Sequence, residues 1–133
     1  MLELVVQTER RTQLVDLTER VRDAVAGTDA GALTLFVPHA TAGILLQASG
    51  PGARHVAADL EAALDGLVGE SANWRHLEEG DRNPWAHVRA ALTASSVTVP
   101  IDGGELPLGE HQTIFLCEFD GPRSRRLLLA LHR

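Results

Sequence analysis

Short apolar segments with alternating side chains are the feature that most limits what this 133-residue chain can fold into. From Ser95 to Ile101 the alternation is strict, and from Gly31 to Val37 apolar residues occupy every second position. A period of two is typical of strands that bury one face. Thr34 and Phe36 lie on the other face of the second segment, and we expect that face to be covered as well.

Seven segments of this kind are predicted to form strands, with charged or glycine- and proline-rich stretches between them. They cover residues 2–8, 12–17, 31–37, 43–47, 95–101, 110–118 and 126–131. The first two are expected to form a hairpin, because Glu9-Arg10-Arg11 has the character of a charged turn. A second hairpin turn is expected at Asp102-Gly103-Gly104-Glu105.

Helices are predicted to interrupt these strands. Residues 53–68 carry apolar side chains at helical spacing. Shorter helices are expected over residues 19–26, capped by Thr18, and over residues 85–94, just after Pro84. This order favours an α+β domain with a mostly antiparallel sheet or sandwich and two or three helices.

The length and charge of the chain limit the classes of protein to which it can belong. A chain of this length fits a single domain, residues 1–133, with one core. The formal net charge is −6 and the single basic cluster spans residues 123–126, which argues against binding to nucleic acid or to an anionic membrane. No apolar run approaches the ~20 residues of a membrane helix, and the N-terminus lacks the features of a signal peptide. Cys117 is the single cysteine, and we expect a small buried side chain in a cytoplasmic protein.

The stretch from Val37 to Leu46 is the first candidate for a functional site. A strand reaches Pro38, and a corner with His39 and Thr41 follows before the next apolar run. Proline cannot donate a hydrogen bond to a strand ladder, so it marks the end of the strand. We expect a small polar pocket around His39, with Thr41 among the residues that bind a substrate.

Two further histidines are expected to join His39. The polar segment of residues 70–84 is long for so small a domain and carries His76, and His87 follows it. Three neutral imidazoles with an open fourth position would suit a catalytic metal site. Their spacing matches no standard zinc motif, so separate hydrogen-bonded histidines are the alternative. Acidic residues that could orient the imidazoles are Glu78, Glu79 and Asp81.

The basic cluster near the C-terminus is a candidate anion site. Arg123, Arg125 and Arg126 carry guanidinium groups that can bind phosphate or carboxylate. Alternate residues of a strand face opposite sides, so at most two of the three can reach one pocket. We assign substrate binding to Arg123 and Arg125; the alternative is charge that keeps a sheet edge solvated.

Several short motifs occur in order along nearly the whole chain. They are His39-Ala40-Thr41-Ala42-Gly43, Asp59-Leu60-Glu61, Trp74-Arg75-His76-Leu77-Glu78-Glu79-Gly80, Pro84-Trp85-Ala86-His87-Val88-Arg89-Ala90, Ser95-Ser96-Val97-Thr98-Val99-Pro100 and Phe115-Leu116-Cys117-Glu118-Phe119-Asp120-Gly121-Pro122-Arg123. Their order and spacing together resemble the YjbQ family, also called the UPF0047 or secondary thiamine-phosphate synthase family.

This resemblance implies a small α+β domain with an antiparallel sheet, assembled as a homotrimer. It implies that His39, His76 and His87 gather in one catalytic or metal site, with zinc or magnesium as the candidate divalent metal. It also implies a weak thiamine-phosphate synthase activity, which joins a pyrimidine diphosphate to a thiazole phosphate and releases diphosphate. Arg123 and Arg125 would help the diphosphate to depart. The alternative is a trimeric binding module that holds a phosphorylated small molecule or a metal without turnover.

Two positions depart from the family pattern. The Asn-Glu-Asn that usually follows the histidine corner reads Gln47-Ala48-Ser49, so a carboxylate is missing at Ala48. A family Gly-Thr-Trp-Gln reads Gly109-Glu110-His111-Gln112. Glu110 and His111 could replace the lost carboxylate only if they point into the same pocket, and adjacent strand residues point to opposite faces.

Overall fold

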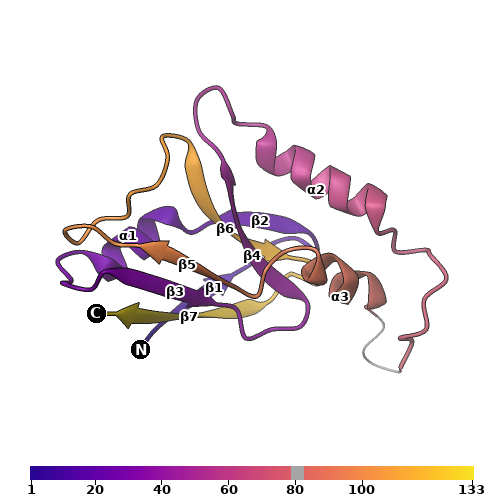
Figure 1. Cartoon of the computed structure of the whole chain (residues 1–133). Helices are drawn as coiled ribbons and strands as arrows, with labels where there is room; N and C mark the ends of the chain where they lie inside the picture. The colour runs from indigo at the N-terminus through magenta and orange to yellow at the C-terminus, as the bar shows by residue number, and fades with distance from the viewer. Residues whose placement is uncertain (79–82) are drawn as a thin grey trace.

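A computed structural model describes residues 1–78 and 83–133 of the chain. Two antiparallel sheets pack face to face, and the described helices lie at their ends and over one outer face (Figure 1). The strands are β1 (Leu2–Gln7), β2 (Gln13–Asp16), β3 (Ala32–Phe36), β4 (Ala42–Ala48), β5 (Ser96–Pro100), β6 (Gln112–Glu118) and β7 (Ser124–His132). The helices are α1 (Thr18–Val25), α2 (Val56–Leu67) and α3 (Pro84–Ala91). The predicted α+β class is confirmed.

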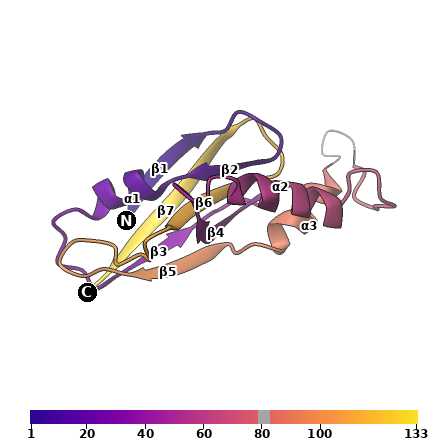
Figure 2. The same cartoon turned by 90° about the horizontal axis from the view of Figure 1, so that it is seen from above.

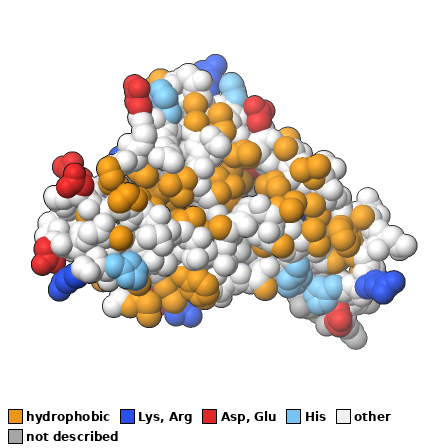
Figure 3. All heavy atoms as spheres, viewed as in Figure 1, with side chains coloured by type: hydrophobic (Ala, Val, Ile, Leu, Met, Phe, Trp, Pro, Cys, Tyr) orange, Lys and Arg blue, Asp and Glu red, His pale blue; other side chains and the backbone are white. Residues whose placement is uncertain are grey.

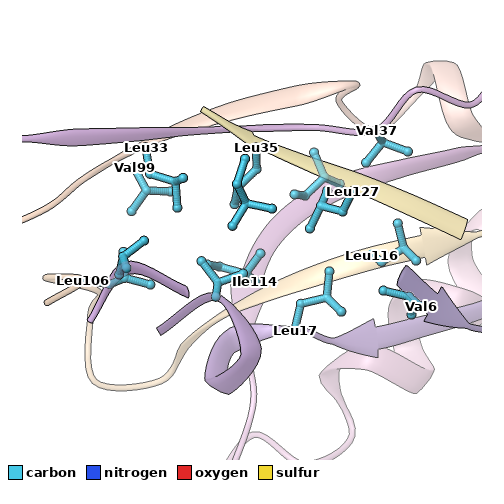
Figure 4. Close-up of a cluster of buried hydrophobic side chains, with 14 of the residues drawn as sticks. Val6, Leu17, Leu33, Leu35, Val37, Val99, Leu106, Ile114, Leu116 and Leu127 are labelled. Atoms are coloured by element: carbon cyan, nitrogen blue, oxygen red, sulfur yellow. The ribbon is translucent and has the colours of Figure 1, made fainter. Parts of the chain in front are cut away.

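The main core lies between the two sheets, because alternate strand residues point to a common side. One sheet has the strand order β1-β7-β3-β5 and the other has the order β2-β6-β4. Inward side chains of both sheets meet in a layer that excludes water (Figure 4). Buried members of this layer include Leu33, Leu35, Ile114, Leu116 and Leu127. Burial of one such side chain contributes about 1.5–3 kcal/mol to folding.

The outer face of the four-stranded sheet is not covered by any described helix, which corrects one prediction. Phe36 is 42% exposed there and Val5 is 54% exposed. Thr34 is half-buried, and its hydroxyl lies 3.1 Å from the Thr98 hydroxyl and 2.8 Å from His132 Nε2. A covered face was expected because Phe36 is apolar, but the described helices α2 and α3 lie on the other sheet.

The predicted N-terminal hairpin is wrong. β1 pairs with β7 in one sheet, while β2 pairs with β6 in the other. The connection between β1 and β2 therefore crosses from sheet to sheet, and the backbone N–H of Thr8 donates to the Arg123 carbonyl at 2.9 Å. The turn at residues 102–105 does form, with Asp102 and Glu105 exchanging backbone hydrogen bonds. It does not join paired strands either, because β5 pairs with β3.

The outer face of the three-stranded sheet is covered by α2 and α3 (Figure 2). Leu60 and Leu64 of α2 pack there with Phe115 and Cys117 of β6. Cys117 is fully buried, as predicted, and burial raises the pKa of its thiol to about 12. A second apolar cluster thus places both helices on one side of the molecule, opposite the end where α1 lies (Figures 1 and 2).

The helix ends differ slightly from the predicted ones. α2 begins at Val56 rather than at residue 53, and α3 begins at Pro84 and ends at Ala91 rather than at residue 94. Thr18 does not cap α1 through its side chain. Its hydroxyl accepts a hydrogen bond from the Ile114 N–H at 3.0 Å, so tertiary packing uses the group that a cap would need.

A buried arginine joins α2 to α3. Arg89 of α3 is 2% exposed, and its Nε and Nη2 atoms donate to the Val68 carbonyl at 2.9 and 2.7 Å. A third nitrogen pairs with Asp65 at 2.8 Å. The last carbonyls of a helix have no partner within the helix, so Arg89 satisfies one just past the end of α2. This contact fixes where the polar segment after α2 begins. No helix of the described residues has the length and apolar character to span a bilayer.

Candidate functional site

Two of the three predicted histidines come together beside α3. The ring centroids of His76 and His87 lie 5.0 Å apart, with their planes at 75°. Both rings line a cavity of about 410 Å³, together with Trp74, Arg75, Pro84 and Val88. Figure 3 shows histidine side chains next to hydrophobic ones on the side of the molecule where α3 lies. The volume is within the range of small-molecule sites.

The start of α3 places His87 in this cavity. Pro84 occupies the first turn of the helix, where its missing N–H costs no hydrogen bond. Just before it, the Asn83 amide donates to Asp120 Oδ2 at 2.7 Å, and Arg123 donates to the same oxygen at 2.9 Å. Arg123, a predicted substrate ligand, is therefore tied to the residue that precedes α3, although it does not line the cavity.

The other wall of the cavity comes from the segment after α2. The Trp74 indole N–H donates to the Gly69 carbonyl at 3.0 Å, which orients the ring. His76 Nδ1 contacts the carboxylate of Glu78. Glu78 was a predicted partner of the imidazoles; Glu79 and Asp81, the other two, lie outside the described residues.

Polar atoms without partners gather at the start of α3. His87 Nε2, Asn83 Oδ1 and Trp85 Nε1 are buried and make no hydrogen bond within residues 1–78 and 83–133. A buried polar atom that is left unpaired costs about 1–3 kcal/mol. Such groups are usually satisfied, and three of them occur here within residues 83–87.

His39 does not join the pair of rings. Its Nε2 accepts a hydrogen bond of 2.9 Å from the backbone N–H of Arg126 on β7. It lines a separate cavity of about 190 Å³, which it shares with His87. Burial lowers the pKa of the His39 imidazole, and the positive charge of Arg125 lowers it further. His39 is therefore neutral at pH 7.

The predicted three-histidine metal site is not formed by the described residues. They contain no group of three or more His, Cys, Asp or Glu side chains placed to hold a metal ion. A metal needs the lone pair of each ligand nitrogen, and the Nε2 lone pair of His39 accepts the Arg126 N–H instead. Binding of zinc or magnesium by His76 and His87 remains a prediction.

Thr41 and Arg125, predicted to bind a substrate, lie in an internal network. Arg125 is 3% exposed, and its Nε lies 2.9 and 3.1 Å from the two carboxylate oxygens of Glu118. Its Nη2 donates to the Thr41 hydroxyl at 2.8 Å. Because these groups are buried and paired with one another, the structure does not support either residue as a substrate ligand.

Glu118 is the residue that sequence reasoning missed. Burial would raise the pKa of its carboxyl, but hydrogen bonds from Arg125, Thr8 and the backbone outweigh burial and lower it. The available signal was an acidic residue at the end of an apolar strand, because a buried carboxylate needs a cation beside it. Arg125, seven residues later in the sequence, is the cation that pairs with it.

Gly43 brings the His39 corner close to α3. A Cβ atom at this position would lie 1.9 Å from Thr93 Oγ1 and 2.9 Å from the Ala94 carbonyl oxygen. Only glycine allows β4 to approach the segment after α3 so closely. The Ile44 N–H then donates to the Ala94 carbonyl at 2.8 Å. His39, in the corner before β4, and His87 of α3 both line the smaller cavity.

His111 does not compensate for the missing carboxylate at Ala48. His111 and Glu110 line a polar cavity of about 180 Å³ together with Asp16 and Ser49. Neither residue lines the cavities that contain His39, His76 or His87. The site beside α3 therefore gains no acid from this departure.

The comparison with known proteins decides the family. A family model described as UPF0047 protein YjbQ-like matches residues 2–133. The chain belongs to the YjbQ-like UPF0047 family. Among UPF0047 relatives, a protein of Archaeoglobus fulgidus is 34% identical over 128 residues, which cover 96% of this chain and 98% of the relative. YugU of Bacillus subtilis is 34% identical over 130 residues, covering 92% and 91%.

Solved structures of similar proteins share the fold. A YjbQ/UPF0047 family protein of Clostridium acetobutylicum superimposes with a TM-score of 0.89 at 33% identity, covering 98% of this chain and 99% of that one. The protein TT1486 of Thermus thermophilus gives a TM-score of 0.86 at 35% identity, with coverage of 98% and 99%.

Proposed function

We propose that the cavity lined by His76 and His87 is the functional site of this YjbQ-like protein and that it takes a small phosphorylated molecule. The observation that carries the proposal is the contact between the two imidazoles, at 5.0 Å, beside the buried and unpaired Nε2 of His87. Arg75 also lines the cavity and supplies a cation for a phosphate group.

We propose a weak transfer of the thiamine-phosphate synthase type as the reaction. The carbon–oxygen bond to the diphosphate of a pyrimidine breaks, and the nitrogen of a thiazole phosphate bonds to that carbon. The departing diphosphate takes up negative charge, which Arg75 can balance, and one imidazole can protonate its oxygen. The family resemblance supports this choice of reaction, and the pair of rings supports its place.

The test is product formation from the two precursors. His87→Asn removes a ring that lines the cavity, while His55→Asn makes the same change on the surface near the start of α2. We expect product formation to fall about 10²-fold in His87→Asn, as for loss of one general acid, and to stay unchanged in His55→Asn. Equal rates in the two variants would refute catalysis at this site.

A binding module without turnover is the second candidate. The burial of Arg125 in a pair with Glu118 favours it, because one of the two cations expected to help a diphosphate leave is committed elsewhere. The missing carboxylate at Ala48 points the same way. Calorimetry with phosphate esters, zinc and magnesium tests this candidate: heat of binding without product formation supports it, and no heat with any of them counts against it.

Assembly as a homotrimer is also proposed. The exposed outer face of the β1-β7-β3-β5 sheet supports self-association, because Phe36 and Val5 leave apolar surface open there. Sedimentation equilibrium tests the assembly, with Phe36→Glu as the variant expected to dissociate it. A wild-type protein that sediments as a monomer would contradict this part of the proposal.

A further inference from the structure

The residue that precedes α3 is held by the connection between β6 and β7. Asn83 occupies the N-cap position of α3, where the side-chain oxygen of an asparagine usually accepts a hydrogen bond from the first turn. It makes no such cap here. Its amide nitrogen donates instead to Asp120 Oδ2 at 2.7 Å, across 37 residues of sequence. Asn83 is 7% exposed, so this tertiary bond is largely shielded from water.

Asp120 is itself fixed from two sides. The Arg123 side chain donates from Nη2 to the same Oδ2 atom and from Nε to the Asp120 carbonyl, both at 2.9 Å. The backbone N–H of Asp120 donates to the buried carboxylate of Glu118 at 3.1 Å. A charged carboxylate accepts hydrogen bonds that are about twice as strong as those between neutral groups. Asp120 therefore offers Asn83 a strong acceptor whose position the β6–β7 connection determines.

The anchored residue lies about one helical turn before His87. An α-helix has about 3.6 residues per turn, and His87 follows Asn83 by four positions. A second anchor of α3 is Arg89, which binds the Val68 carbonyl and so the start of the segment that carries His76. The two imidazoles come from separate segments, so their distance of 5.0 Å depends on where these anchors place α3.

We propose that Asp120 is a positioning residue for His87: through Asn83 it fixes the start of α3 and keeps the His87 ring against the His76 ring. This role rests on the function proposed for the cavity that the two rings line. The described lining of that cavity does not include Asp120, so Asp120 acts without touching the substrate. A displacement of reacting groups by about 1 Å can lower a rate about 10²-fold, so an anchor outside the cavity matters for turnover.

The first test compares two substitutions of Asp120. Asp120→Leu removes the acceptor at similar size, whereas Asp120→Asn keeps an oxygen that can accept from the Asn83 amide. Per folded molecule, kcat should fall about 10-fold in Asp120→Leu with KM nearly unchanged, and Asp120→Asn should restore most of it. Urea unfolding gives the folded fraction, so lost stability alone does not produce this result. An unchanged kcat in Asp120→Leu, or an equal fall in both variants, would overturn the proposal.

Asp29→Leu is the matched control. Asp29 is also paired with an arginine, Arg133, at 3.1 Å, but its side chain is 81% exposed and lines no part of the His76–His87 cavity. Its kcat should equal that of the wild type. A fall as large as that of Asp120→Leu would show that the loss of any paired aspartate has this effect, and would overturn the assignment to Asp120.

Asn83→Ala tests whether Asp120 acts through Asn83. If it does, Asp120→Leu lowers kcat no further in protein that already carries Asn83→Ala. Two independent roles would instead multiply their separate losses, and that outcome would exclude the route through Asn83.

NMR of the histidine rings tests the position of His87 without turnover. An aromatic ring shifts the signals of its neighbour, so the ring C–H signals of His76 and His87 report their contact. These signals should move in Asp120→Leu and in Asn83→Ala and stay in place in Asp120→Asn, while those of the surface residue His55 stay in place in all three. If the wild type forms no product, the proposed reaction fails, and these signals alone decide the positioning role. Unmoved His87 signals in Asp120→Leu or, where that variant does not fold, in Asn83→Ala would overturn it.

Discussion

Replacement of Arg125 by methionine should lower the free energy of unfolding by about 3–5 kcal/mol, the range for removing one partner of a buried ion pair. Arg125 is 3% exposed, and the carboxylate of Glu118 is fully buried. The hydrogen bond from the Thr8 hydroxyl to Glu118, at 2.7 Å, survives the change. The Thr8 hydroxyl carries no charge, however, so the buried Glu118 carboxylate is left without a counterion.

Arg123→Met is the matched control, because it makes the same change two residues earlier. The Arg123 side chain is 50% exposed and pairs with Asp120 at 2.9 Å. Exposed pairs of this kind contribute about 0–1 kcal/mol. Urea unfolding at pH 7, followed by circular dichroism, measures both variants. With a slope of about 1–3 kcal/mol per molar urea, the midpoint of Arg125→Met should fall by more than about 1 M. Equal midpoint shifts in the two variants would refute the reasoning.

The pH dependence of the same pair gives an independent check. The wild-type fold holds the pKa of Glu118 below its usual 4.5, so this carboxylate contributes stability above pH 4.5 and loses it as the pH falls further. Without Arg125, burial raises that pKa, and protonation removes the unpaired charge. The stability difference between Arg125→Met and the wild type should therefore shrink as the pH falls from 7 toward 4.5. A difference that grows on acidification would contradict this account.

Three further predictions concern single positions. Gly43→Ala should lower the free energy of unfolding by about 1–3 kcal/mol, because its Cβ would lie 1.9 Å from Thr93 Oγ1. Gly69→Ala is the control: its Cβ would have no atom within 4 Å, so the free energy of unfolding should change by no more than about 0.5 kcal/mol in the same urea assay. The pKa of the His39 imidazole, measured by NMR titration, should lie below 6.5 because the ring is partly buried. The free energy of unfolding should then fall as the pH drops below 6.5, because the unfolded state takes up the proton first. An NMR titration midpoint at or above 6.5 would count against the buried environment of this ring. Cys117 should resist iodoacetamide at pH 8 until urea unfolds the protein, and rapid labelling of the folded protein would show that its pKa is not raised.

Part of the candidate site follows from local sequence. Pro84 predicts the start of a helix, and His87, three residues later, must then lie in the first turn of α3. The long polar segment before it predicts a functional loop, and His76 of that segment does lie against His87. Local signals succeed here because both histidines belong to neighbouring segments of the chain.

The hydrogen-bond partner of His39 could not be predicted from the local sequence. The corner after Pro38 was found from sequence, but its imidazole accepts a backbone hydrogen bond from Arg126, 87 residues later. Nothing near His39 in the chain specifies that partner. Glu118 and Arg125 are only seven residues apart, but the alternation of a strand does not say which face is buried, so their pairing in the interior was not predicted.

The sequence by itself determined the α+β class, the alternation of the strands and which residues of a strand share a face. Only the tertiary structure decided that β1 and β2 join different sheets and that Arg125 faces inward while Arg126 faces out. The physical reason is that a period of two sorts side chains into two faces without saying which face is buried. That choice depends on which strands pair, and distant parts of the chain decide this pairing. For Arg125 it also depends on Glu118 of the other sheet, which is near in sequence but meets Arg125 only after both sheets have formed.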